Sequence, residues 1–197
     1  MSKNFFEIKD VTFAIGGKNK VNDVNISIKN EGDTICILGP SGIGKTTILR
    51  TIAGLEKINK GEIILKDKVI SSDKIHIEPE KRNIALSFQE NSLFPHYSVD
   101  KNIHLGIKKN SPTDKNIDSK EIIKILNIED ILSKYPHQIS AGEAQRASLA
   151  RSLISQPDLL LLDEPLSNVD QSFKEDIQVS LKQLLNKNKI TTIVVTH

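Results

Sequence analysis

The residues best suited to chemistry form a glycine-rich loop in the first quarter of the chain. The pattern G-x-x-x-x-G-K-[ST] lies within the stretch Gly39, Pro40, Ser41, Gly42, Ile43, Gly44, Lys45, Thr46 and Thr47. An apolar, β-branched run over 34–38 precedes it, and apolar residues at helical spacing follow it until Gly54. In such a strand, loop and helix, backbone N–H groups converge on an anion. We expect Lys45 to contact the β- and γ-phosphates of a nucleoside triphosphate and Thr46 to ligate Mg²⁺.

Further polar residues follow other predicted strands. They are Gln89 after 84–88, Asp163 and Glu164 after 159–162, and His197 after 190–195. Ligands of parallel α/β sheets bind at the carboxyl ends of the strands, which is where these side chains fall. We expect Asp163 to hold Mg²⁺ and Glu164 to orient and polarise the attacking water. Taken alone, each of these residues is better explained as part of an ordinary exposed turn, and the functional interpretation depends on their occurring together with the glycine-rich loop.

A second predicted helix start combines a serine, a glycine and a glutamate. Ser140-Ala141-Gly142-Glu143 has the S-x-x-E form of a capping box, which explains the serine and the glutamate. It does not explain Gly142, because glycine destabilises a helix by about 0.5–1 kcal/mol relative to alanine. We therefore expect another group to approach this backbone closely. A serine-headed helix N-terminus is also a second candidate anion site.

The composition excludes several classes of protein. The chain has 197 residues, 38% of them hydrophobic, and a net charge of +2, which does not suggest a nucleic-acid-binding surface. The sequence contains no apolar run of the ~18–20 residues that a membrane span requires, and it does not begin with a signal peptide. These features predict a cytosolic protein whose membrane role depends on a partner. The single cysteine, Cys36, is expected in the core on a buried strand.

The order of the predicted elements indicates an α/β fold. Residues 1–88 and 157–197 are predicted to form the nucleotide-binding core, and 89–156 a helical subdomain. Several strands are too close together for helical crossovers, so an antiparallel layer is expected beside the parallel core. Predicted strands outside the parallel core cover 6–11, 12–15, 24–28, 61–65 and 69–70, and predicted helices cover 99–105, 121–126, 140–156 and 171–185. Asp118 and Glu121 predict a capping box at the second of these helices.

Together these motifs resemble the ATPase subunit of an ABC transporter over essentially the whole chain. In the terms of that family, 39–47 is the Walker A loop, 139–143 with Gln145 and Arg146 the signature, 159–165 Walker B and 167–170 the D-loop. Gln89 and His197 correspond to the Q-loop glutamine and the switch histidine. The resemblance implies a P-loop NTPase fold with a RecA-like parallel core, an antiparallel β subdomain and an inserted helical subdomain.

The resemblance also implies roles and partners. Glu164, His197, Gln89 and Lys45 would be catalytic, and Thr46, Gln89 and Asp163 would hold the Mg²⁺ of Mg-ATP. In a head-to-tail homodimer, or a pair with another ABC subunit, residues 140–143 of one copy would contact the γ-phosphate bound by the other. Asp170 would lie at the dimer contact. Transmembrane permease subunits and a periplasmic or extracellular substrate-binding protein would complete an importer on the cytoplasmic face of the inner (plasma) membrane.

The sequence departs from the family pattern in three places. Ala141 and Glu143 stand where the signature usually has glycine and glutamine, and the added methyl is expected to slow closure. Ile15 takes the position where an aromatic side chain usually stacks on adenine, with Phe13 on the same strand face. The chain ends at His197, so we expect a truncated C-terminal end.

Two segments are similar to importer ATPases for ferric iron, namely 93–99 and 135–137, and the short 108–116 segment agrees. Subunits for polyamine, sulfate, molybdate or sugar uptake share much of this pattern. Phe94 is expected in the groove that receives a permease helix. The alternatives are a soluble ABC ATPase acting on nucleic acid or ribosomes, a P-loop kinase or GTPase, and a nucleotide-binding module without turnover. A P-loop kinase or GTPase would leave the signature helix unexplained.

Overall fold

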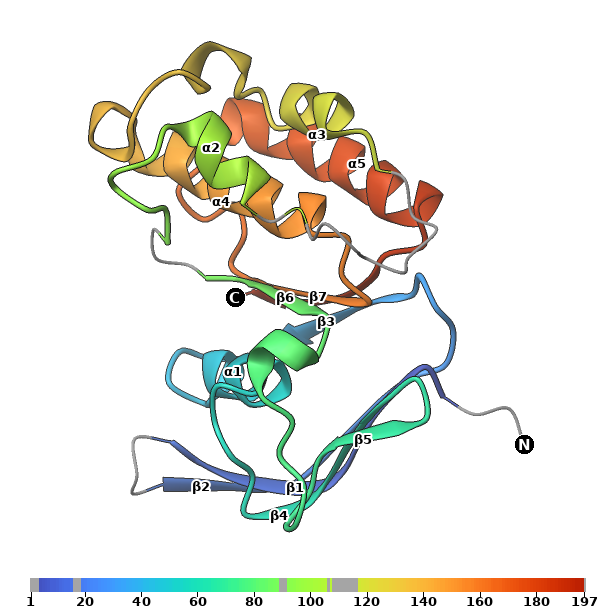
Figure 1. Ribbon diagram of the computed structural model, residues 1–197. Coiled ribbons are helices and arrows are strands. Elements are labelled where there is room, and N and C mark those ends of the chain that lie inside the picture. The colour runs from blue at the N-terminus through green and yellow to red at the C-terminus, as the bar shows by residue number, and fades with distance from the viewer. Residues whose placement is uncertain (1–3, 16–18, 89–91, 106, 108–116, 197) are drawn as a thin grey trace.

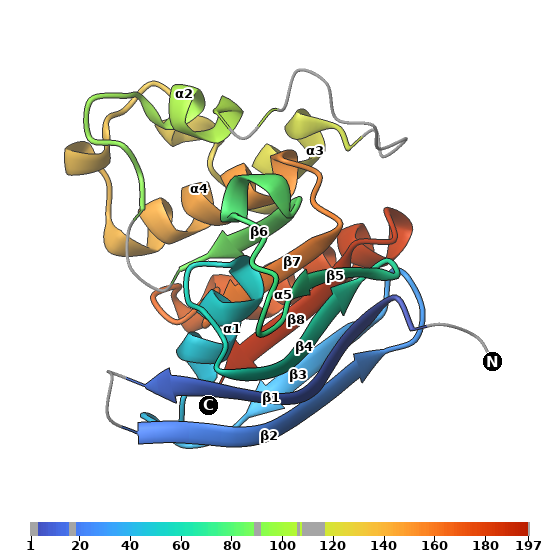
Figure 2. The same cartoon turned by 60° about the horizontal axis from the view of Figure 1, so that its bottom comes forward.

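The protein is described here from a computed structural model, which covers residues 4–15, 19–88, 92–105, 107 and 117–196. Its elements stack in layers (Figure 1). Helices α2 to α5 lie on one side of a parallel sheet, and α1 lies on the other side, between that sheet and an antiparallel sheet. Turning the molecule brings the antiparallel sheet forward and shows α1 held between the two sheets (Figure 2).

The strands are β1 (Phe6–Ile15), β2 (Asn19–Ile28), β3 (Thr34–Leu38), β4 (Lys60–Leu65), β5 (Lys68–Ser71), β6 (Ile84–Ser87), β7 (Leu159–Asp163) and β8 (Thr191–Thr196). The α-helices are α1 (Lys45–Ala53), α2 (Val99–His104), α3 (Ser119–Ile125), α4 (Ala141–Ile154) and α5 (Gln171–Lys187). Short 3₁₀ turns are η1 (Pro79–Lys81), η2 (Glu129–Ile131) and η3 (Pro136–Gln138). Within the described part of the chain, no helix has the length and apolar character needed to cross a membrane.

The parallel core is confirmed, with strand order β3-β8-β7-β6. Its central strand β7 consists of four leucines and Asp163, all buried. Leu160 and Leu162 face the cluster that contains α4 and α5, whereas Leu159 and Leu161 face the cluster that contains α1 and β1. A strand covered on both faces has no solvent-exposed face, which is why its sequence is a continuous apolar run rather than an alternation of apolar and polar residues.

The antiparallel layer is also confirmed, with strand order β2-β1-β4-β5. The prediction of two separate strands over 6–11 and 12–15 was wrong, because β1 is one continuous strand. Its register shifts between Ile8 and Val11 and again before Phe13, and Asp10 has a φ of 48°. These irregularities are β-bulges, and they explain why the alternation of apolar residues breaks within a single strand.

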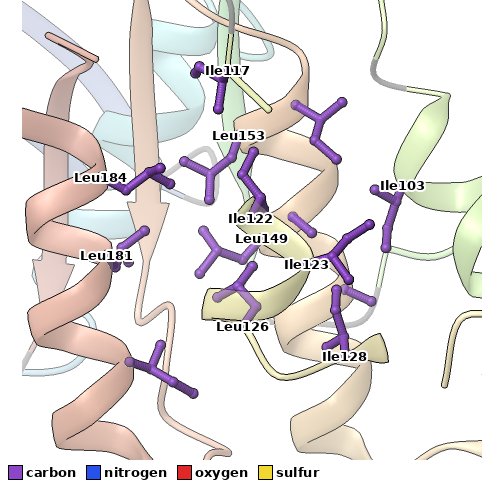
Figure 3. Close-up of a cluster of buried hydrophobic side chains, with 14 of the residues drawn as sticks. Ile103, Ile117, Ile122, Ile123, Leu126, Ile128, Leu149, Leu153, Leu181 and Leu184 are labelled. Atoms are coloured by element: carbon purple, nitrogen blue, oxygen red, sulfur yellow. The ribbon is translucent and has the colours of Figure 1, made fainter. Parts of the chain in front are cut away.

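The helices between β6 and β7 share a core with the helix that follows β7. Ile122 of α3, Leu126 directly after it and Leu149 of α4 lie in one buried cluster with Leu181 and Leu184 of α5 (Figure 3). α4 is buried along most of its length, as expected for a helix packed between the sheet and other helices. The boundaries of a helical subdomain at 89 and 156 stay a prediction.

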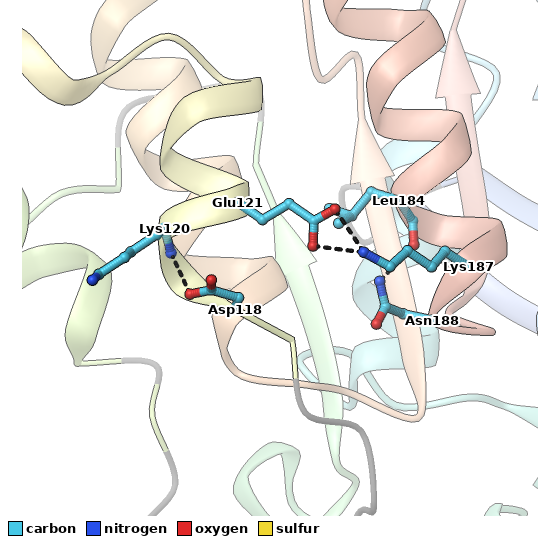
Figure 4. Close-up of polar contacts among 6 residues, drawn as sticks. All are labelled: Asp118, Lys120, Glu121, Leu184, Lys187 and Asn188. Carbon is cyan, nitrogen blue, oxygen red and sulfur yellow. Dashed lines mark hydrogen bonds and ion pairs between the residues drawn. The ribbon is translucent and has the colours of Figure 1, made fainter.

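The predicted capping box at α3 was only half right. The Asp118 carboxylate accepts a hydrogen bond from the Lys120 N–H at 2.9 Å and so caps the helix. Glu121 instead reaches across to α5, where its two oxygens lie 2.9 and 3.0 Å from Lys187 Nζ (Figure 4). The Glu121 side chain therefore forms a tertiary ion pair instead of the hydrogen bond to the helix start that the local pattern predicted.

The expectation that Cys36 is buried was wrong. β3 is an edge strand with β8 as its sole neighbour in the described sheet. Ile35 and Ile37 face the apolar cluster around α1, whereas the alternate side chains Cys36 and Leu38 point the other way and are exposed, Leu38 to 68%. An apolar run reveals that a strand is hydrophobic, but it does not reveal which of its faces another element covers.

Arg82 connects three elements around α1. Its guanidinium donates to the Ile52 carbonyl oxygen of α1 at 2.9 Å, to the Ile77 carbonyl oxygen at 2.6 Å and to Ser71 Oγ of β5 at 2.8 Å. Burial lowers the pKa of Arg82 to about 10, against a smaller rise caused by Glu78, so the group stays charged at neutral pH. The charge lies at the C-terminal end of α1, where the helix dipole favours a cation.

We expect Arg82→Met to lower the free energy of unfolding by about 3 kcal/mol, because it leaves several buried acceptors without a donor. Urea unfolding followed by circular dichroism measures the change. The matched control is Arg50→Met on α1, which removes an exposed pair with Glu56 at 3.2 Å. That pair is expected to contribute less than about 1 kcal/mol. Equal losses for the two variants would contradict a structural role for the buried guanidinium.

Candidate functional site

Three distant parts of the chain meet at one cavity of about 310 Å³. Its lining consists of Ile15 at the end of β1, Ser41, Gly42, Gly44, Lys45, Thr46 and Thr47 of the glycine-rich loop and α1, and Glu164 after β7. The loop and Glu164 come together because β3 and β7 are parallel strands of one sheet that end at the same edge. The cavity is thus the place at which the predicted phosphate-binding and catalytic residues meet.

The conformation of Gly44 explains why the loop needs glycine. Gly44 has a φ of 106° and is the residue at which α1 begins, with its carbonyl accepting from the Ile48 N–H at 2.9 Å. A Cβ atom at this position would lie 2.6 Å from Ile15 Cδ1. The left-handed backbone is therefore the main reason for glycine here, and a larger residue would also have to displace the end of the Ile15 side chain.

The Lys45 side chain folds back over the glycine-rich loop that precedes it. Its side chain donates from Nζ to the carbonyl oxygens of Gly39 at 2.6 Å and Pro40 at 3.0 Å, and the residue is only 8% exposed. The loop thus folds around the ammonium group and fixes its position at the start of α1. A cation held beside the N-terminus of a helix is suited to binding the oxygens of a polyphosphate.

Ile15 lines the cavity, but Phe13 does not contribute to it. Phe13 is buried in the core formed by the antiparallel sheet and α1. The described side chains thus place an aliphatic group where an aromatic ring is usual in the family that the sequence resembles. Contact with a base through Ile15 would be an apolar contact rather than ring stacking.

Asp163 and Glu164 stand side by side at the end of β7 in different surroundings. Asp163 is the last residue of the strand and is buried. Glu164 is partly exposed, and its φ of 46° is unusual for a residue other than glycine. Such backbone outliers persist only where the neighbouring structure holds them, and they cluster at functional sites.

The oxygen donors near the cavity fit a magnesium ion. Thr46 offers a hydroxyl and Asp163 a carboxylate, which are the hard ligands that Mg²⁺ prefers. No group of three or more His, Cys, Asp or Glu side chains in the described residues could form a closed metal site. This is compatible with Mg²⁺, because Mg²⁺ usually takes one or two protein ligands and completes its shell with phosphate oxygens and water.

Gln89 and His197 lie outside the described residues. The strands that lead to them, β6 and β8, end at Ser87 and Thr196 at the same sheet edge as the cavity. Their roles stay predictions.

The predicted capping box of α4 is present. Ser140 Oγ accepts from the Glu143 N–H at 3.2 Å, and the Ser140 N–H donates to Glu143 Oε2 at 2.7 Å. The bond from the Ser140 N–H is the main reason why the pKa of the Glu143 carboxyl lies below its usual value, against a smaller opposing effect of burial. Ser140 and Ala141 are exposed, and no residue of 140–143 lines the cavity of the same chain. A role for Ser140 at a phosphate would therefore need a second copy.

The group that approaches Gly142 belongs to the same chain. A Cβ atom on Gly142 would lie 2.5 Å from the carbonyl oxygen of Asn168, in the segment between β7 and α5. One turn along α4, Gln145 bonds to the same segment. In the sequence Gln145 stands out only as part of the signature motif, and no local pattern predicts this contact. Asp170, expected at a dimer contact, is exposed at the start of α5.

The chain is similar to import ATPases over its whole length. It is 37% identical over 199 residues to the Fe(3+) ions import ATP-binding protein FbpC of Fusobacterium nucleatum subsp. nucleatum, with 100% of this chain and 52% of that protein covered. It is 36% identical over 198 residues to the spermidine/putrescine import ATP-binding protein PotA of Haemophilus influenzae, with 100% and 52% covered. The chain spans about half the length of these curated relatives.

Solved ATP-binding cassettes have the same fold. The dimeric cassette MJ0796 in a post-hydrolysis state bound to ADP and Pi superposes with a TM-score of 0.81 at 28% identity, with 98% of this chain and 88% of that chain covered. CbiO1 of Clostridium perfringens, part of the ABC transporter complex cbiONQ, gives a TM-score of 0.78 at 27% identity, with 98% and 78% covered. The prediction of a P-loop ATPase fold with a parallel core and an antiparallel sheet is confirmed.

Residues 21–167 match the family described as ABC transporter, and this match contains the glycine-rich loop, the signature helix and the Asp163-Glu164 pair. The chain therefore belongs to the ABC transporter family.

Proposed function

We propose that this chain is the ATP-binding and ATP-hydrolysing part of an ABC importer, with Mg²⁺ as cofactor. The observation that carries the proposal is the cavity that joins the Lys45 loop to Glu164 in a chain of this family. The similarity to import ATP-binding proteins over the full chain supports the importer type.

Lys45 and the loop amides would bind the phosphates. On binding, the ammonium would exchange the carbonyl oxygens of Gly39 and Pro40 for oxygens of the β- and γ-phosphates. The loop would lose little freedom in this exchange, because Gly44 and α1 already hold the backbone in its bent form. Ile15 would form an apolar contact on the side of the cavity that faces β1.

Glu164 would act on the attacking water. Its carboxylate would orient the water and polarise it for in-line attack on the γ-phosphorus, while ADP leaves. Thr46 and Asp163, with Gln89, would hold Mg²⁺, which supplies charge stabilisation to the phosphate oxygens when bound. His197 would contact the γ-phosphate and complete this part of the site.

A second copy would supply the opposite wall of the site. Ser140 begins α4, is exposed and lies outside the cavity of its own chain, so it is available to a nucleotide held by a partner. The proposed arrangement is a head-to-tail homodimer, or a pair with another ABC subunit, with residues 140–143 at the phosphate and Asp170 at the dimer contact. The dimeric state of the similar cassette MJ0796 supports this arrangement.

An exposed aromatic group between β6 and α2 is the proposed contact for a permease. Phe94, 47% exposed, packs edge-to-face near Tyr97, and the Arg151 guanidinium lies 5.8 Å from the Phe94 ring centroid. Asn102 is buried and fixes this loop by donating to the carbonyl oxygens of Phe94 and Tyr97, both at 3.0 Å. A rigid loop that exposes an aromatic ring suits a helix of a membrane partner. The subunit would thus be peripheral, on the cytoplasmic face of the membrane.

Ferric iron is the proposed cargo, and polyamine uptake is the second candidate. The similarity to FbpC at 37% identity supports iron, and the similarity to PotA at 36% identity supports a polyamine. Sulfate, molybdate and sugars are further alternatives. The ATPase does not bind the cargo itself, so a substrate-binding protein outside the membrane would select it.

Glu164→Gln tests the enzymatic role. We expect the full-length protein to lose ATP turnover by at least about 10²-fold, because the variant keeps the shape of the side chain but cannot polarise water as a carboxylate does. ATP binding and ATP-dependent dimerisation should remain, as measured by equilibrium dialysis and light scattering. The control is Glu175→Gln on the exposed face of α5, which should turn over ATP at the original rate. Full activity in Glu164→Gln would contradict the assignment.

Lys45→Ala tests the binding role. We expect ATP to bind about 10–100-fold more weakly, which corresponds to the loss of charge-assisted hydrogen bonds of about 1.5–3 kcal/mol. Lys57 is exposed beyond the end of α1, so Lys57→Ala is the matched control and should leave the dissociation constant unchanged. An unchanged affinity for Lys45→Ala would show that the loop does not hold the phosphates.

Phe94→Ala tests the membrane contact. We expect it to reduce the amount of a polytopic membrane protein that co-purifies with the full-length protein from solubilised membranes. Phe173→Ala is the control, because Phe173 on α5 is similarly exposed, at 50%, but lies far along the chain in another element. Equal recovery with Phe94→Ala and Phe173→Ala would place the membrane contact elsewhere.

Uptake of ⁵⁵Fe(III) and of labelled spermidine in cells that lack the protein would separate the two candidate cargoes.

A further inference from the structure

Gln145 is a buried polar side chain to which the proposed reaction assigns no role. It lies on the second turn of α4, five positions after Ser140, and is 3% exposed. A buried amide must satisfy both its donor and its acceptor groups. The contacts that do so all lie in the segment that follows β7.

The amide group bonds to three residues of that segment. Gln145 Nε2 donates to the Glu164 carbonyl oxygen at 2.9 Å and to Ser167 Oγ at 3.1 Å. Gln145 Oε1 accepts from the Asn168 N–H at 3.0 Å. The orientation of the amide is fixed by chemistry, because a backbone carbonyl can only accept and a backbone N–H can only donate.

These bonds hold a strained residue. Glu164 has a φ of 46°. A left-handed backbone is unfavourable for any residue that has a Cβ atom, so interactions with the surrounding structure must offset its free-energy cost. The Glu164 N–H donates to the Val195 carbonyl oxygen at 3.0 Å, and its carbonyl accepts from the Ser167 N–H at 3.1 Å as well as from Gln145. Gln145 is therefore a side chain from outside the segment that holds the Glu164 backbone in this conformation.

The backbone of α4 packs on the same segment. Gly142 lies three positions before Gln145, on the same helix face, and the Asn168 carbonyl oxygen would lie 2.5 Å from a Cβ atom there. The first two turns of α4 and residues 164–168 therefore contact each other closely and cannot shift independently. Ser140, which caps this helix, belongs to the same unit.

We infer that Gln145 is a positioning residue that sets the orientation of the Glu164 carboxylate through its backbone and couples it to the start of α4. This inference rests on the proposed ATPase function. Its consequence is that a phosphate contact at Ser140 in one site adjusts the water-polarising glutamate of the other site, within a single chain.

Gln145→Glu tests the inference, because the variant keeps the shape of the side chain but cannot donate to the Glu164 carbonyl oxygen. In the full-length protein we expect kcat to fall by about 10–100-fold, while KM for ATP changes less than about twofold, since the Lys45 loop is untouched. Gln183→Glu, on an exposed face of α5, is the control and should keep the original kcat. If Gln145→Glu does not fold, Gln145→Met, which removes all of the amide's hydrogen bonds without adding a charge, takes its place.

A double variant separates positioning from a general structural effect. The double variant carries both Gln145→Glu and Glu164→Gln, and phosphate release from γ-labelled ATP is followed over hours. We expect this release to be as slow as in the Glu164→Gln single variant, because Gln145 acts through Glu164. The inference would be overturned if kcat of Gln145→Glu lay within twofold of that of the original protein. It would also be overturned if the reductions in kcat of the two single variants multiplied in the double variant. Neither result would contradict the proposed ATPase function. An original protein without ATP turnover would instead overturn the proposed function, and the inference with it.

Discussion

The parallel hydrogen bonding of β3, β8 and β7 is the constraint on which the rest of the molecule depends. Leu38 pairs with Thr196 and Asp163 with Val195, so the strands end together at one edge of the sheet. Parallel strands cannot be joined by tight turns, and the chain must leave the sheet and return between them. The glycine-rich loop and Glu164 meet because each begins where a strand of this sheet stops.

The crossovers between these strands form the two layers that surround the sheet. α1 follows the glycine-rich loop and packs between the sheets, where the buried Arg82 guanidinium holds its C-terminal end. The loop at its N-terminal end is thereby fixed as well. On the other face, α4 and α5 flank the segment that carries Glu164, and their leucines share one core. Both halves of the site therefore rest on packed elements rather than on long loops, which favours precise positioning.

Much of the fold and of the site could be predicted from the sequence. The Gly44-Lys45 loop, the apolar run of β7 and the Ser140 capping box are local patterns, because their physical causes lie within a few neighbouring residues. The failures concern side chains whose partners are distant in sequence. Glu121 pairs with Lys187 rather than with its own helix start, and Cys36 is exposed because its side chain lies on the face of β3 opposite to the apolar cluster around α1.

The sequence by itself determined the glycine-rich loop and the family, since these depend on residue types at short, fixed spacings. The tertiary structure alone decided what approaches Gly142 and what Gln145 binds. Both answers lie between β7 and α5, on residues that no spacing rule links to α4. A buried amide can be recognised as satisfied only when the backbone groups that surround it are known, and those are brought together by the packing of a helix on a sheet edge.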